Sequence, residues 1–174
     1  HLLDGRLRRA RDEVQDHLAE VIADIITRYP DDGVHLDRVR YAGPGYSYDP
    51  TSNQAAGEVE TPARDQWQRD RVTTFVRRVT DEAHNRRLPT SAAVWPYASD
   101  RWGWGVSEGY DDYYQDAKGW ARGGDVDVII PMMYGGAMDD PARWQVVLFE
   151  DVEHRQCGAA GQRVAAEGGA VMAR

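Results

Sequence analysis

One stretch of this sequence decides the fold: Val126-Asp127-Val128-Ile129-Ile130-Pro131-Met132-Met133-Tyr134. It is apolar almost throughout, whereas a strand with one face in water alternates between apolar and polar residues. An unbroken apolar run of this length is typical of a strand that is covered on both faces in a parallel sheet. We therefore expect residues 126–134 to form a buried strand of such a sheet.

Two more strands are predicted upstream of this stretch. Residues 34–37 alternate, so that Val34 and Leu36 share one face of a strand while His35 and Asp37 share the other. A second candidate strand covers residues 91–97. Helical spacing of apolar residues predicts the intervening helices, at residues 8–28, 64–86, 110–121 and 141–156, and residues 42–63 form a polar loop without periodicity.

The order of these elements predicts an α/β fold. Helices and strands alternate, which is the pattern of parallel strands joined by crossover helices. Three parallel strands alone would leave both outer strands with unpaired edges. The sequence also starts at His1 without a signal-peptide pattern. We therefore expect an internal piece of a larger protein, whose exposed strand edges favour self-association.

Three segments carry a resemblance to a known family. The first is Asp32-Gly33-Val34-His35-Leu36-Asp37, followed by Arg40-Tyr41, and the second is Gly109-Tyr110-Asp111-Asp112-Tyr113-Tyr114-Gln115-Asp116. The third joins Val126-Asp127 to Pro131-Met132-Met133-Tyr134. In this order the segments resemble the barrels of glycosyl-hydrolase-like family 10, over roughly residues 10–150.

The resemblance implies a partial (β/α)₈ TIM barrel that contains about strands four to six with their helices. The barrel would cover residues 1–157. Residues 158–174, rich in Ala and Gly, do not resemble the family's seventh strand and would be a tail of uncertain structure. A truncated reading frame or a degenerate domain would explain this departure.

The implied function is that of a glycoside hydrolase acting on a polysaccharide or oligosaccharide. The parent protein would be bacterial and secreted or attached to the cell envelope, although this sequence carries no signal for either location. We expect the isolated chain to be inactive, because sites of this fold draw residues from many strands. Two alternatives remain open: a carbohydrate-binding barrel without catalysis, and a truncated, non-functional gene product.

Asp37 is the candidate catalytic residue. Catalytic groups of such barrels lie at the carboxyl ends of strands, and Asp37 ends the strand at 34–37. Glycosidic cleavage uses two carboxyl groups that flank the scissile bond. The alternative is a structural aspartate bonded to a neighbouring arginine or to loop backbone. Spacing does not identify the second carboxylate, for which the candidates are Asp100, Glu108, Asp139 and Asp140.

The candidate substrate-binding residues surround Asp37 or follow the other strands. Arg40 could orient Asp37 through a bidentate pair, or form an ion pair with a purely structural role. Six Trp and nine Tyr against two Phe favour rings with a polar edge, which suit sugar surfaces. Interior packing is the alternative for each ring and for the histidine. The candidates are His35, Arg40, Tyr41, Trp95, Trp102, Trp104 and Tyr134.

Composition excludes several kinds of partner. A formal net charge of −8 argues against nucleic acid, which needs a basic surface. No apolar run approaches the ~20 residues of a membrane span. His35 and Asp37 would supply only two metal ligands where three or four are needed, so we expect no metal and no cofactor. The expected partners are carbohydrate and, through strand edges, other copies of the chain.

Overall fold

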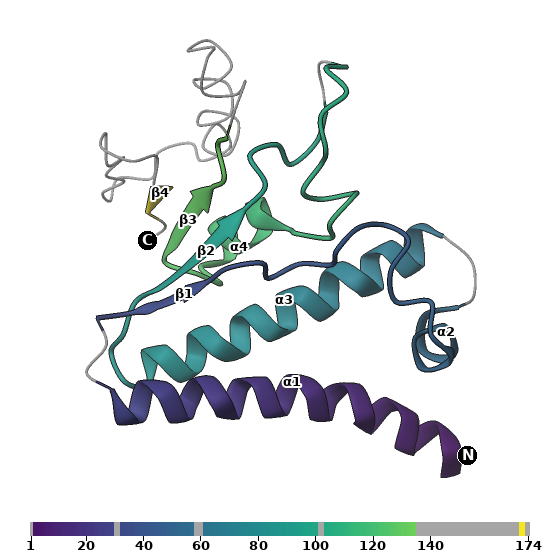
Figure 1. Ribbon diagram of the computed structural model, residues 1–174, viewed down its shortest axis with the longest axis horizontal. Coiled ribbons are helices and arrows are strands. Elements are labelled where there is room, and N and C mark those ends of the chain that lie inside the picture. Colours follow the sequence, from purple (N-terminus) through teal and green to yellow (C-terminus); the bar gives the residue numbers. More distant parts are fainter. Residues whose placement is uncertain (1, 30–31, 58–60, 101–102, 135–170, 173–174) are drawn as a thin grey trace.

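The computed structural model describes residues 2–29, 32–57, 61–100, 103–134 and 171–172, and Figure 1 shows their arrangement. Helices and strands alternate along the chain as the sequence predicts. The elements are α1 (Leu2–Arg28), β1 (Val34–Leu36), α2 (Pro50–Ala56), α3 (Pro62–His84), β2 (Thr90–Val94), α4 (Ala117–Gly123), β3 (Val128–Pro131) and β4 (Val171–Met172).

The sheet has the order β1-β2-β3-β4, and its first three strands are parallel, which confirms the predicted α/β class. His35 lies opposite Ser91, which lies opposite Val128. The short β4 pairs antiparallel with β3 at Val128 and Ile129. The outer edge of β3 is therefore partly covered, and our expectation of two open edges was wrong on this side.

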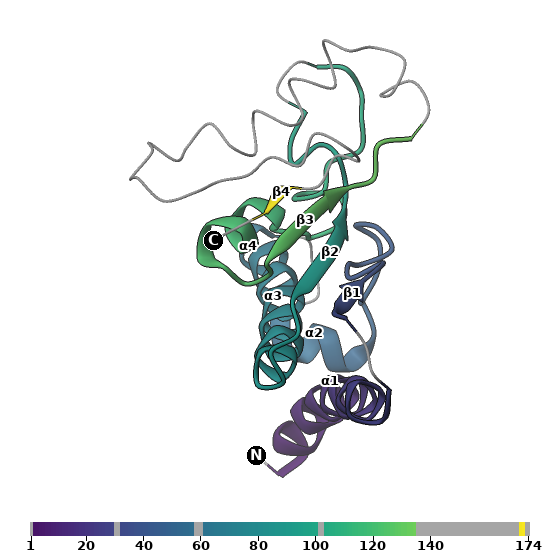
Figure 2. The same cartoon turned by 90° about the vertical axis from the view of Figure 1, so that its left-hand side faces the viewer.

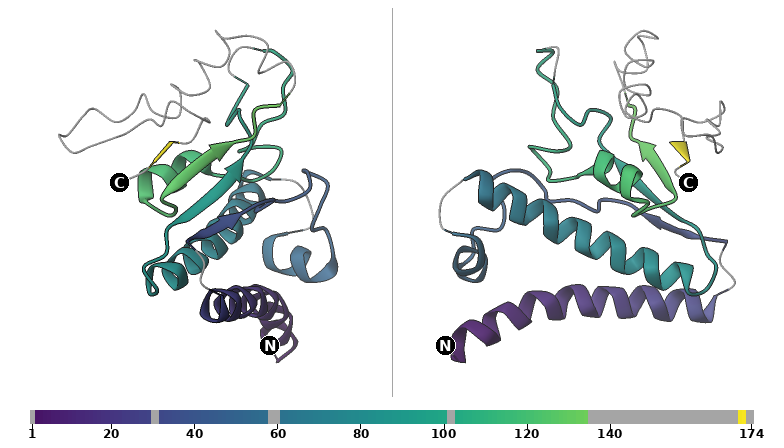
Figure 3. Two further views of the ribbon diagram at one scale, coloured as in Figure 1. Left: turned by 60° about the vertical axis from the view of Figure 1, so that its left-hand side comes forward. Right: turned by 180° about the vertical axis from the view of Figure 1, so that it is seen from behind.

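The helices cover one face of the sheet. In Figures 1 and 3, α3 lies between the sheet and α1. The side chains that alternate toward this face form the core, and they come from the strands, α3 and α4. The core residues are Leu36, Val39, Val72, Val76, Val79, Ala92, Val94, Ala117, Trp120, Val126 and Ile129. The other face carries His35, Ser91 and Ala93, which alternate with these core positions, and none of the described helices packs on it in Figure 2.

Helix α3 begins and packs for reasons that its sequence shows. The Thr61 side chain accepts a hydrogen bond from the Arg64 N–H, and Pro62 occupies the first turn, where its missing N–H costs nothing. Val76 and Val79 are fully buried against the sheet. Burial of a valine side chain stabilises the fold by about 1.5 kcal/mol or more, so this stripe fixes the rotation of α3.

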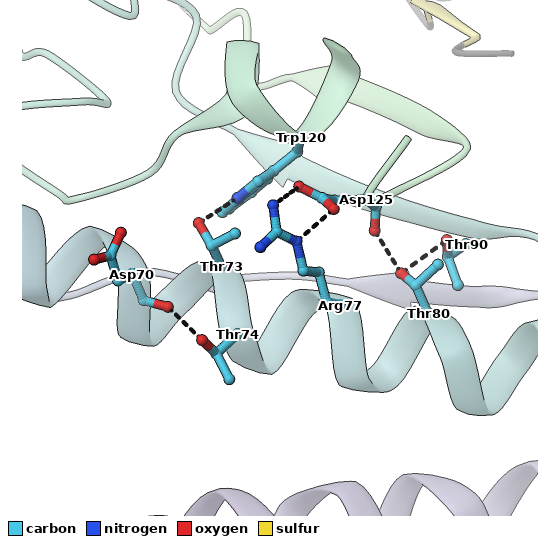
Figure 4. A network of polar contacts seen from close by, with 8 residues as sticks. All are labelled: Asp70, Thr73, Thr74, Arg77, Thr80, Thr90, Trp120 and Asp125. Carbon is cyan, nitrogen blue, oxygen red and sulfur yellow. Dashed lines mark hydrogen bonds and ion pairs between the residues drawn. The ribbon is translucent and has the colours of Figure 1, made fainter. Parts of the chain in front are cut away.

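A polar network ties α3 to the start of β3 (Figure 4). The Arg77 guanidinium donates to both carboxylate oxygens of Asp125, over 2.6 and 3.1 Å. The Thr80 hydroxyl donates to the Asp125 carbonyl over 2.7 Å, and the Trp120 indole N–H donates to the Thr73 hydroxyl over 2.9 Å. These contacts satisfy polar groups that α3 and the turn before β3 bury against each other.

Two predicted elements differ in the structure. The helix predicted at 110–121 exists but begins later: Tyr114 has a left-handed φ of 55°, and α4 starts only after Asp116, whose side chain caps it by accepting from the Gly119 N–H. The predicted loop at 42–63 contains α2, which Asp49 caps ahead of Pro50. The helix predicted at 141–156 and nearly all of the tail at 158–174 lie outside the described residues.

Asp127 ties the amino ends of the strands together and makes the stability depend on pH. One of its oxygens, Oδ2, accepts from the Thr90 N–H over 2.7 Å and lies 2.8 Å from His84 Nε2. Partial burial alone would raise the pKa of Asp127, but the hydrogen bonds from His84 and Thr90 outweigh it and hold this pKa below its ordinary value. The carboxylate form therefore favours the folded chain.

The free energy of unfolding should consequently fall with the pH in acid. The contribution of Asp127 is complete above the ordinary aspartate pKa of about 3.9 and is lost as the pH drops through the lower folded value. Asp127→Asn should flatten the pH dependence in this window, measured by urea unfolding at a series of pH values. Asp81→Asn, which removes an exposed carboxylate of α3, is the control. An equal slope for Asp127→Asn and the unmodified chain would contradict this role.

Candidate functional site

The carboxyl ends of β1 and β2 lie side by side, because the two strands are parallel. Asp37 directly follows β1 and Trp95 directly follows β2. In Figure 1 the segment that follows β1 runs along α3 toward α2, whereas the segment that follows β2 extends toward the top of the view. The site predicted from the sequence therefore corresponds to one edge of the sheet.

Asp37 and His35 stand on the open face of β1, on either side of the buried Leu36. Both are exposed. The Asp37 Oδ1 accepts a hydrogen bond from the Arg38 N–H over 2.8 Å, and Arg38 takes a left-handed φ of 54°. His35 Nδ1 lies 2.8 Å from the Ser91 hydroxyl on β2. The described residues contain no group of three or more side chains that could hold a metal ion.

Arg40 does not pair with Asp37 in the described contacts. Its guanidinium carbon lies 5.3 Å from the ring centre of Trp95 and 5.0 Å from that of Tyr113. These two rings stack on each other, with centres 4.4 Å apart and planes 12° from parallel. Trp95 and Arg40 thus meet in one cluster with Tyr113, a residue that the sequence did not single out.

Gln115 holds the two strand ends together. It is 1% exposed, and its amide nitrogen donates to the carbonyls of Val39 and Ala93, each over 3.2 Å. Its amide oxygen accepts from the Trp95 N–H over 3.0 Å. One side chain thereby satisfies a backbone group of the turn after β1, one of β2 and one of Trp95 directly after β2, and so it joins the two strand ends.

Tyr41 packs beside this junction rather than facing water. It is partly buried against the core, and its ring meets Tyr114 edge-on with centres 5.3 Å apart. Its backbone N–H donates to the Tyr113 carbonyl over 3.2 Å. The turn after β1 is therefore joined to residues 113–115 by both backbone and ring contacts.

The loop after β2 is organised around two of the candidate carboxylates. Asp100 accepts from the backbone N–H groups of Trp104 and Gly105, over 2.9 and 2.7 Å, which accounts for both of its oxygens. The Asp100 N–H lowers the pKa of Glu108, but burial and the carboxylates of Asp111 and Asp112 raise it by more, so this pKa lies above its usual range.

The first turns of α3 anchor both loops, through buried polar residues that sequence periodicity did not reveal. Arg64 is fully buried, donates to the carbonyls of Ser47 and Gly57, and lies 4.1 Å from the Tyr48 ring centre. Arg69 donates to the Tyr110 carbonyl over 3.3 Å. A helical wheel places such residues on a solvated face, and only the loops that fold over α3 bury them.

The remaining ring candidates are placed differently. Trp104 is partly buried and meets the Tyr97 ring edge-on with centres 6.0 Å apart. Tyr134, just beyond β3, is 78% exposed. Trp102, Asp139 and Asp140 lie outside the described residues. As for membranes, none of the helices in the described part of the chain is long and apolar enough to span one.

Comparison with known proteins agrees with this architecture. The model of the family described as glycosyl hydrolase-like 10 matches residues 7–155. Glycosyl hydrolase DigH of Escherichia coli K12 is 27% identical over 149 residues, which cover 78% of this chain and 33% of DigH. Glycosyl hydrolase YngK of Bacillus subtilis is 26% identical over 148 residues, which cover 78% of this chain and 29% of YngK.

The chain spans about a third of the length of these curated relatives. The family match itself runs through the whole predicted site, from α1 across β1, β2 and β3. This chain belongs to the glycosyl hydrolase-like 10 family.

Proposed function

We propose that this segment supplies part of the active site of a glycoside hydrolase, which cleaves a polysaccharide or oligosaccharide with the help of carboxylates. The observation that carries the proposal is the place of Asp37, exposed at the carboxyl end of a parallel strand. Catalytic groups of barrel enzymes lie at this end. The family and the names of the relatives support the same reaction class.

The proposal includes a complete (β/α)₈ barrel around this segment. Three parallel strands with helices on one face are what a sector of such a barrel contains. The open face with His35, Ser91 and Ala93 would then line the barrel interior. Residues at the carboxyl ends of the strands would contact the substrate.

In the proposed reaction Asp37 is the carboxylate that stabilises or attacks the sugar carbon. Such a group must be ionised, and Asp37 is exposed at a turn where only the Arg38 N–H donates to it among the described contacts. Glu108 is the proposed proton donor, because an acid catalyst needs a raised pKa, and burial together with the carboxyl groups of Asp111 and Asp112 raises the pKa of Glu108.

The proposed sugar contacts are those whose side chains remain accessible at the same edge. Trp104 and Tyr134 offer rings near the strand ends, and His35 offers its second ring nitrogen. Trp95 already stacks on Tyr113 with one face, which leaves its other face for a sugar. Tyr41, which packs against the core, would contribute indirectly, by supporting the turn that carries Arg40.

A chimaera tests the proposed function. In this protein, called the barrel chimaera below, residues 7–155 replace the matching segment of E. coli DigH, which supplies the rest of the chain. We expect it to release reducing ends from at least one polysaccharide of a broad panel. Circular dichroism and a cooperative thermal transition establish that it folds. A folded barrel chimaera that binds polysaccharides without cleaving any would favour a carbohydrate-binding barrel. It would contradict the proposed hydrolase function.

We expect the isolated chain to self-associate, because it leaves a strand edge and an apolar helix face exposed. One edge of β1 has no partner strand among the described residues. Helix α1 also exposes a stripe of apolar side chains, which are Val14, Leu18, Val21 and Ile25. Sedimentation equilibrium should give a mass above the 19.6 kDa of a monomer, and replacing Leu18 and Ile25 together by Glu should lower it. A monomer at every concentration would contradict the prediction.

A further inference from the structure

Arg40 differs from the other arginines that the structure withdraws from solvent. In the described part of the chain, Arg64, Arg69 and Arg71 are also buried or half-buried, and each donates to at least one oxygen. Arg40 is half-buried and has no side-chain hydrogen bond or ion pair there. A guanidinium that has lost part of its hydration without gaining an anion is costly, unless a ligand provides the anion.

The surroundings hold this guanidinium in one place. Its distances to the stacked rings of Trp95 and Tyr113, 5.3 and 5.0 Å, are nearly equal, so it lies beside the stacked pair and not on the outer face of either ring. The Arg40 Nε is buried and has no acceptor among the described residues. The Trp95 Nε1 is buried there without an acceptor as well. A buried donor without an acceptor destabilises the fold unless a ligand supplies the acceptor.

The position of Arg40 connects this free cation to the proposed active site. Arg40 lies three residues after Asp37, and its ring partner Trp95 directly follows β2. An arginine presents a planar fork of N–H groups that matches the two oxygens of a carboxylate. The chain is acidic overall, with a net charge of −8, yet no acidic side chain of the described residues occupies this fork.

We propose that Arg40 binds a carboxylate carried by the sugar, so that the substrate of this site is an acidic polysaccharide with uronate-type residues. The inference rests on the proposed function, and it adds a substrate class to it. A neutral sugar would leave the guanidinium without a counter-charge. A carboxylate would pair with the exposed end of the fork while the rings of Trp95 and Tyr113 keep the fork in its plane.

Nuclear magnetic resonance of the whole 174-residue chain tests this directly. The Arg40 Nε–H is shielded from water, which favours its observation. Sodium glucuronate should shift this signal, whereas its methyl ester, which has the same ring but no charge, should not. Arg40→Met should lower the affinity for glucuronate ~10-fold or more, the loss expected when one charged hydrogen-bond partner is removed. Arg122→Met, at an exposed arginine of α4, is the control and should bind as the unmodified chain does.

The outcomes separate this inference from the proposed function. Equal shifts from glucuronate and its ester, or no shift from either, would overturn the role of Arg40. Cleavage of neutral and acidic polysaccharides at the same rate by the barrel chimaera would also overturn it, while the hydrolase would stand. A barrel chimaera that binds acidic polysaccharides more tightly than neutral ones but cleaves neither would support the role of Arg40. It would contradict the proposed hydrolase function.

Discussion

Gln115→Met is expected to lower the free energy of unfolding by ~3–5 kcal/mol, because it leaves several buried backbone groups without partners. Methionine has about the same length and shape, but it cannot replace the amide that donates to Val39 and Ala93 and accepts from Trp95. Whole domains of this size are stable by only about 5–15 kcal/mol. Loss of one side chain should therefore remove a large part of the stability.

Urea unfolding followed by tryptophan fluorescence measures this loss. Gln54→Met, at an exposed position of α2, is the matched control and should change the free energy of unfolding by less than ~0.5 kcal/mol. Water that enters the site and satisfies the freed carbonyls would reduce the cost. A change below about 1 kcal/mol in Gln115→Met would therefore show that this residue does not hold the strand ends.

Asp37→Asn in the barrel chimaera should lower kcat by ~10³-fold or more, which corresponds to about 4 kcal/mol of transition-state stabilisation. The substitution removes the charge but keeps an oxygen that accepts from the Arg38 N–H, so the turn after β1 should stay intact. KM should change little, because the charge acts on the transition state and not on the bound sugar. Initial rates of reducing-end release give both constants.

The same strand provides the control for this experiment. Asp32 is exposed and lies just before β1, at the amino end of the strand, so Asp32→Asn changes the net charge equally but far from the carboxyl edge. We expect it to retain the kcat of the unmodified barrel chimaera. Near-normal turnover in Asp37→Asn would assign Asp37 a structural role and contradict the proposed mechanism.

The strands, and which of their side chains point to the buried or the open face, could be predicted because both follow from local periodicity. The alternation of Val34, His35, Leu36 and Asp37 gives the buried and open faces of β1 without any knowledge of its neighbours. The apolar run that contains β3 indicates a parallel sheet for the same reason. These features locate Asp37 at the edge where the structure has it.

The connections within the site could not be predicted in this way. Gln115 and Arg64 are polar residues that are buried because segments distant in sequence fold over them. Periodicity does not distinguish them from solvated residues, although Gln115 lies in one of the segments that carry the family resemblance. Likewise, the left-handed conformation of Tyr114 keeps the residues before Ala117 out of the helix predicted at 110–121, although their spacing is helical.

Arg40 lies close to Asp37 in the sequence but does not pair with it in the structure. Arg40 follows Asp37 by three positions, which favours an ion pair between them. The left-handed Arg38 and the hydrogen bond from the Arg40 N–H to the Arg38 carbonyl, 2.8 Å long, instead turn the chain tightly. The guanidinium then meets Trp95 and Tyr113, and the charge of Asp37 stays free of it.

The central claim, that a sugar chain is cleaved at the carboxyl edge of this sheet, is tested most directly by a crystal structure of the Asp37→Asn barrel chimaera with a bound oligosaccharide. The substitution should stop turnover while the site keeps its shape, so an uncleaved chain can be seen. We expect the anomeric carbon of a glycosidic bond to lie within ~4 Å of the side-chain amide at position 37. An oligosaccharide bound elsewhere, with the side chain at this position in contact only with protein, would contradict it.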